Sequence, residues 1–176
     1  MTRQALLSQI VLESRALTAR YFAGFDDSNR TKQVVNVPNH FAWTLGHLAY
    51  TMQSAAKRID GGAVPESDFV TGGTPKGGGD ARRFAVESVS MGSVPVDDPS
   101  QYPTHARCLE IFSAACERCA AAFAAAGEAD LEKDIPWGAA PIKGWQLAPR
   151  MVWHNGDHAG QLADLRRALG FKSIFS

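Results

Sequence analysis

The chain has 176 residues, 45% of them hydrophobic, with 18 basic and 18 acidic side chains. This length predicts one domain with an apolar core, spanning residues 1–176. A formal net charge of zero leaves no excess of cations for a phosphate backbone, so we expect no nucleic-acid partner.

The first predicted helix covers roughly residues 2–24. Its apolar residues fall at steps of four, seven and four, which predicts one buried helix face made of Leu6, Ile10, Leu17 and Tyr21. Polar residues interrupt the stretch, so it lacks the continuous apolar centre of a signal peptide or a membrane span. We therefore expect a cytoplasmic protein with no membrane partner.

The second predicted helix covers roughly residues 39–60, between a cap at Val37-Pro38-Asn39 and a stop at Gly61-Gly62. One stripe of this helix holds Trp43, His47, Tyr50 and Ser54. After it, residues 61–102 are rich in glycine and proline, and we expect them to cross over to the third helix. No Gly-Lys-Ser/Thr follows their glycines and no strand precedes them, which excludes a phosphate loop.

The third and fourth predicted helices cover roughly residues 103–126 and 145–169. The inward stripe of the third holds Phe112, Cys116, Cys119 and Phe123. The inward stripe of the fourth holds Leu147, Met151, His154, His158, Leu162 and Leu165. The two cysteines have redox spacing but lie within a helix, which favours core packing. The pattern as a whole predicts an all-α four-helix bundle with a long crossover connection between its second and third helices.

His154 and His158 are four residues apart, so their imidazoles lie on one helix face and can converge on one ion. Asn155 stands where zinc proteases have a glutamate, which excludes that class. His47 is the best third ligand, because it lies on the inward stripe of another helix. Each histidine alone is more simply a core residue, but three buried rings without a shared partner would leave several costly unpaired nitrogens. On spacing alone, the metal site and the core interpretation both stay open.

Two segments resemble the DinB-like superfamily of bacterial four-helix bundles. They are NHFAWTLGHLAY, residues 39–50, and HNGDHAGQLADLRRALG, residues 154–170. The resemblance implies a divalent metal ion, zinc or nickel, bound by His47, His154 and His158. It also implies a homodimer and an enzyme that transfers a low-molecular-weight thiol to a small electrophile. A non-catalytic metal- or ligand-binding stress-response bundle is the alternative, and no residue can be assigned a catalytic role from sequence.

Other polar and aromatic residues near these segments have simpler interpretations. We expect Asp157 on the surface, and Gln161 either to border the core or to orient a ligand ring. His40 and His105 lie outside the inward stripes, so both are expected on the surface. The tryptophans are expected to be packing anchors, and they are Trp43, Trp137, Trp145 and Trp153.

Overall fold

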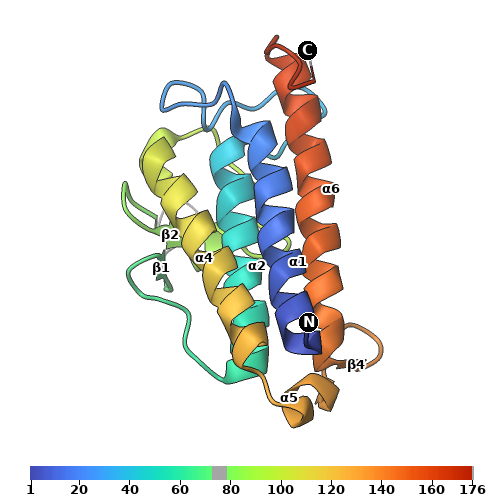
Figure 1. Cartoon of the computed structure of the whole chain (residues 1–176). Coiled ribbons are helices and arrows are strands. Elements are labelled where there is room, and N and C mark those ends of the chain that lie inside the picture. The colour runs from blue at the N-terminus through green and yellow to red at the C-terminus, as the bar shows by residue number, and fades with distance from the viewer. Residues whose placement is uncertain (73–78, 176) are drawn as a thin grey trace.

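The computed structural model of the chain describes residues 1–72 and 79–175. Its long helices are α1 (Arg3–Ala19), α2 (Phe41–Asp60), α4 (His105–Ala125) and α6 (Leu147–Ala168). They lie side by side (Figure 1). Both α1 and α2 contact α4 and α6, so the apolar faces of all four meet in one core. The described chain is therefore mostly helical, as the all-α prediction requires, and each predicted helix overlaps one of the four.

A long connection joins α2 to α4, which run in the same direction in Figure 1. The connection therefore returns along the length of the helices. It contains β1 (Phe69–Val70), β2 (Phe84–Ala85), α3 (Val86–Val89) and the 3-10 helix η2 (Pro99–Gln101). β1 pairs with β2 in parallel, with Phe69 opposite Phe84. Residues 73–78, most of the glycine-rich stretch discussed above, lie outside the described residues.

Short elements occupy the turns at the helix ends. The 3-10 helix η1 (Arg20–Phe22) extends α1, and the link from α4 to α6 holds α5 (Glu128–Glu132), β3 (Asp134–Ile135), β4 (Ile142–Lys143) and η3 (Gly144–Gln146). β3 and β4 pair antiparallel. The sequence did not predict these pieces, because strands of two residues are too short to show a period. Among the described helices, none combines the length and apolar character needed to cross a membrane.

Side-chain caps fix the start of three of the long helices. Thr2 and Thr104 accept hydrogen bonds from the first turns of α1 and α4. At α2 the cap is His40, whose ring accepts from the Trp43 N–H, and not the Asn39 region expected from sequence. Because a cap satisfies a backbone donor that the helix cannot satisfy itself, these contacts set where each helix begins.

The predicted buried face of α1 is only partly correct, because Ile10 and Tyr21 are partly buried and pack against the core but the other two residues do not. Leu6 and Leu17 are 45% and 57% exposed. The buried face is one residue further along the helix and consists of Leu7, Val11, Ser14 and Thr18. The hydroxyls of Ser14 and Thr18 can be buried because each donates to a carbonyl of its own helix. The apolar pattern was therefore misleading here, while the predicted stripes of α4 and α6 are correct.

Candidate metal centre

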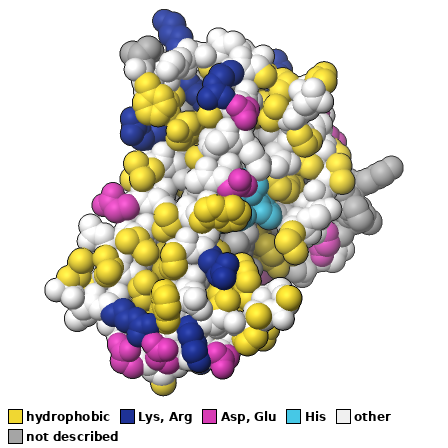
Figure 2. Space-filling model, turned by 90° about the vertical axis from the view of Figure 1, so that its right-hand side faces the viewer, with side chains coloured by type: hydrophobic (Ala, Val, Ile, Leu, Met, Phe, Trp, Pro, Cys, Tyr) yellow, Lys and Arg dark blue, Asp and Glu magenta, His cyan; other side chains and the backbone are white. Residues whose placement is uncertain are grey.

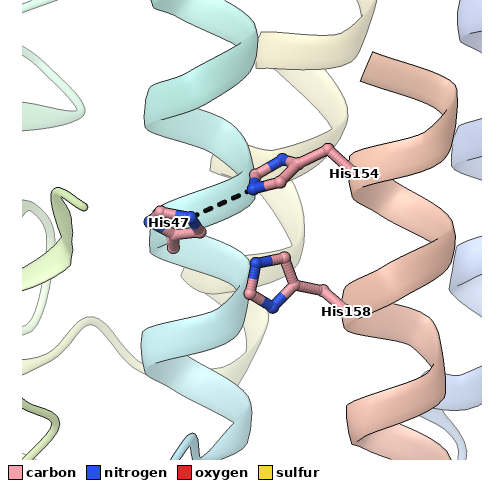
Figure 3. Close-up of side chains that lie close together, drawn as sticks. All are labelled: His47, His154 and His158. Atoms are coloured by element: carbon pink, nitrogen blue, oxygen red, sulfur yellow. Dashed lines mark hydrogen bonds between the residues drawn. The ribbon is translucent and has the colours of Figure 1, made fainter. Parts of the chain in front are cut away.

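The three sequence-predicted histidines meet between two helices (Figure 3). His47 comes from α2, and His154 and His158 come from successive turns of α6. One ring nitrogen from each lies within 4.8 Å of the other two. The Nε2 atoms of His47 and His154 are 3.1 Å apart. The spacing on α6 and the inward stripe of α2 thus bring together all three rings, as expected.

His47 is oriented by the connection that follows its helix. Its Nδ1 lies 2.7 Å from the carbonyl oxygen of Val89. A carbonyl can only accept, so Nδ1 carries the hydrogen and the lone pair is on Nε2, which faces the other rings. The indole of Trp43 stacks on His47 at 4.7 Å and 7°, and its N–H donates to Ser93. Together these contacts leave the His47 ring little freedom to turn.

His158 is oriented by Gln161, one turn further along α6. Its Nδ1 lies 3.0 Å from the Gln161 Oε1, which also accepts from the Asn39 amide at 2.8 Å. Since the Gln161 amide nitrogen donates to Asp157, its oxygen must be the acceptor toward His158. The His158 Nδ1 therefore carries the hydrogen and Nε2 holds the lone pair. This contact confirms Gln161 as a residue that orients a ring.

His154 has a different environment from the other two rings. Its Nδ1 is buried and has no hydrogen-bond partner among the described residues. Its Nε2 faces the lone pair of the His47 Nε2. In the metal-free protein, a hydrogen on the His154 Nε2 is needed for this contact to be attractive. His154 is also the most accessible of the three, being partly exposed.

Burial keeps all three rings neutral. It is the main cause that lowers the pKa of His154 to about 3 and of His158 to about 4, and the neighbouring histidines add to both effects. Burial likewise lowers the pKa of His47 below its usual value. At neutral pH the rings therefore carry free lone pairs, which is the form that coordinates metals.

These residues fit a divalent ion. Two ligands at about 2.1 Å from a tetrahedral ion lie about 3.4 Å apart, close to the 3.1 Å between His47 and His154. Imidazole donors suit zinc or nickel better than magnesium or calcium. Three protein ligands leave a further position free for a small molecule. In Figure 2 a histidine is visible at the surface, and His154 is the partly exposed member of the three.

Several sequence predictions about neighbouring residues are wrong. His40 is fully buried at 0% exposure and lies 3.0 Å from the carbonyl of Val96 through Nε2. His105 is half-buried and stacks on Phe41. Conversely, Trp153 is 71% exposed and does not anchor the core. The position of His40 directly before α2 was a signal for a capping role, because a cap turns inward over the first turn.

Two contributors to the site could not be identified from sequence. The Val89 carbonyl is a backbone atom with no side-chain signature, and Ser93 is one hydroxyl in an irregular segment. Asp157 is exposed, as expected, but it also supports the site by accepting from Gln161. The predicted core cysteines, Cys116 and Cys119, are both fully buried.

The fold and the site together define a class: helical proteins in which histidines from two long helices can hold a metal ion. The family model for the DinB superfamily matches residues 11–162. The chain therefore belongs to the DinB superfamily. Comparison with curated proteins and with solved structures finds no match.

Proposed function

We propose that residues 1–176 form a single DinB-like four-helix-bundle domain that binds zinc or nickel through His47, His154 and His158. The observation that carries this proposal is the convergence of three neutral imidazoles on one point. Two of them are fixed by hydrogen bonds from Nδ1, an arrangement typical of metal-ligating histidines. A homodimer remains a prediction from the family resemblance, and a cytoplasmic location remains a prediction from the N-terminal sequence.

We further propose an enzyme that transfers a low-molecular-weight thiol to a small electrophile. A bound divalent ion lowers the pKa of a thiol or water and so supplies a nucleophile near neutral pH. The chain's own thiols are unsuited to this role, because burial raises the pKa of Cys119 to about 12 and raises those of Cys108 and Cys116 further. The nucleophile therefore has to enter as a small molecule, through the side on which His154 is exposed.

Metal analysis tests the binding step. We expect about one zinc or nickel ion per chain in the purified protein and a large loss in the variant His154→Ala. His105→Ala is the matched control and should retain the metal. His105 is a partly buried histidine on α4, and its ring contact among the described residues is with Phe41 and not with the three candidate ligands. Equal metal content in the wild type and His154→Ala, whether full or zero, would contradict the proposal.

Turnover assays test the reaction. The metal-loaded protein is incubated with a small electrophile and a panel of bacterial thiols, and loss of free thiol is followed. We expect turnover with at least one thiol and none in His154→Ala. A fully metallated protein that turns over no member of the panel but binds one of them tightly would instead support a non-catalytic ligand-binding bundle.

A further inference from the structure

A cationic surface cavity lies at the end of α6, away from the histidines. It measures about 590 Å³ and lies between the end of α1 and residues 171–174. A second cavity of about 410 Å³ adjoins it and shares Arg166, Phe171 and Lys172. Arg166 follows His158 by eight residues, which is about 12 Å along the helix axis. In Figure 2 several Lys and Arg side chains gather at this end of the molecule.

Arg166 is the most informative residue in the cavity wall. Its side chain is only 6% exposed, although buried guanidinium groups are ordinarily paired with an anion. Its Nη2 donates to the carbonyl of Lys172, and the group lies over the ring of Phe171 at 5.5 Å. Its Nη1 is buried with no hydrogen-bond partner in the described part of the chain. Among the described residues, the Arg166 Nη1 is thus a charged donor without an acceptor.

The charges around Arg166 are not balanced by acids. No carboxylate lines either cavity, among the residues that the structure describes. Arg20 lies over the ring of Phe175 at 5.3 Å, and neither it nor Lys172 forms an ion pair within residues 1–72 and 79–175. Arg167 differs, because it pairs with Asp164. Within the described residues, three cations therefore line one cavity that no carboxylate lines.

The cavity also has an apolar side. Phe171, Ile174 and Ala23 contribute to its wall, and its volume is several times that of an inorganic anion. Guanidinium groups match phosphate oxygens in a planar, bidentate geometry, and a phosphate monoester carries close to two negative charges at neutral pH. A ligand with a phosphate at one end and a small organic group at the other satisfies both sides.

We propose that this cavity binds a small organic phosphate monoester. Arg20, Arg166 and Lys172 hold the phosphate, and Phe171 and Ile174 contact the organic group. The site is independent of the metal centre and of the reaction proposed there.

Calorimetric titration of the full chain with phenyl phosphate tests this proposal. We expect saturable binding that is tighter than binding of inorganic phosphate, and a loss of affinity of about tenfold in Arg20→Gln, since one charge-assisted hydrogen bond is removed. Arg20 is exposed, so this variant should fold normally. Lys32→Gln is the matched control, because it makes the same charge change at an exposed residue outside both cavities.

A second variant and a metal-site variant complete the test. Arg166→Met keeps an unbranched side chain over Phe171 and should abolish measurable binding; if it fails to fold, Arg20→Gln decides alone. Because metal ions also bind phosphates, the titration is repeated in His154→Ala, where the affinity should be unchanged whether or not the protein binds metal. Absence of phenyl phosphate binding, equal weakening by Lys32→Gln, or loss of binding in His154→Ala would each overturn the proposal.

Discussion

At Gly46, the residue before His47 on α2, the connection packs closely against the helix. A Cβ atom at this position would lie 2.7 Å from two ring carbons of Phe84 and 2.8 Å from a methyl carbon of Val89. Both residues are fully buried, so neither can turn out into solvent. Val89 also supplies the carbonyl that holds His47. Gly46→Ala should therefore disturb both the packing and the candidate metal centre.

The size of the effect of Gly46→Ala follows from these distances. Ordinary contacts lie at 3.4–4 Å, so the Phe84–Val89 segment has to move by about 1 Å. Such overpacking costs about 1–3 kcal/mol, and the better helix propensity of alanine offsets roughly 1 kcal/mol of it. The net loss is therefore about 0–2 kcal/mol, which lowers the melting temperature of a chain of this length by up to roughly 8 °C. Loosening the hydrogen bond to His47 should weaken metal affinity by about tenfold or more.

Two measurements check the effects of Gly46→Ala. Thermal unfolding followed by circular dichroism on chelator-treated protein gives the stability, and competition with a chromophoric chelator gives the zinc affinity. Gly160→Ala is the control: this glycine is also helical, but a Cβ there meets nothing within 4 Å, so the variant should be more stable by roughly 0.5–1 kcal/mol. If Gly46→Ala melts as high as Gly160→Ala and binds zinc as the wild type does, the proposed link between Val89 and His47 is wrong.

Three further predictions concern the residues around the rings. Gln161→Met removes the acceptor for the His158 Nδ1 and should weaken zinc binding by about 10- to 100-fold in chelator competition; an unchanged affinity would show that the ring needs no such partner. Zinc at 100 times its Kd should stabilise the wild type by about 2.7 kcal/mol, and EDTA should abolish the effect, with His154→Ala showing no response. Burial lowers the pKa of His40 from 6.5 to about 4, so on acidification the unfolded state binds a proton before the folded state does. The free energy of unfolding therefore falls as the pH drops from 6.5 toward 4, by up to about 1.4 kcal/mol per pH unit. His40→Asn, which keeps a capping side chain, should reduce this acid sensitivity in urea unfolding at pH 7 and pH 5, and identical slopes would refute it.

The buried face of a helix was predicted correctly from sequence where its apolar residues followed the helical period without interruption. The stripe of α6 advances by four, three, four, four and three residues through both histidines, and its predicted inward face was correct. On α1 the same reasoning chose a face about one residue away from the buried one: Ser14 and Thr18 are buried, while Leu6 and Leu17 are exposed. Hydroxyls that hydrogen-bond to their own helix behave as small core residues, but a hydropathy pattern counts them as polar.

The three histidines of the candidate metal centre could be predicted from sequence, but most of the groups that orient their rings could not. His154 and His158 share a helix face because they are four residues apart. His47 was added from the inward stripe of α2 and from the family resemblance. The partners that hold these side chains come from the connection. Val89 lies 42 residues after His47, which it contacts, and Ser93 lies 50 residues after Trp43. Nothing in the local composition of an irregular segment indicates which of its backbone atoms will meet a distant side chain.

Because His47 contacts the backbone oxygen of Val89, related chains need not carry valine at this position. Any apolar residue of similar bulk at this position would present the same oxygen, so the identity of the side chain can drift while the chemistry stays intact. The three rings grafted onto another scaffold should therefore bind metal less tightly unless the connection from α2 to α4 is transplanted with them.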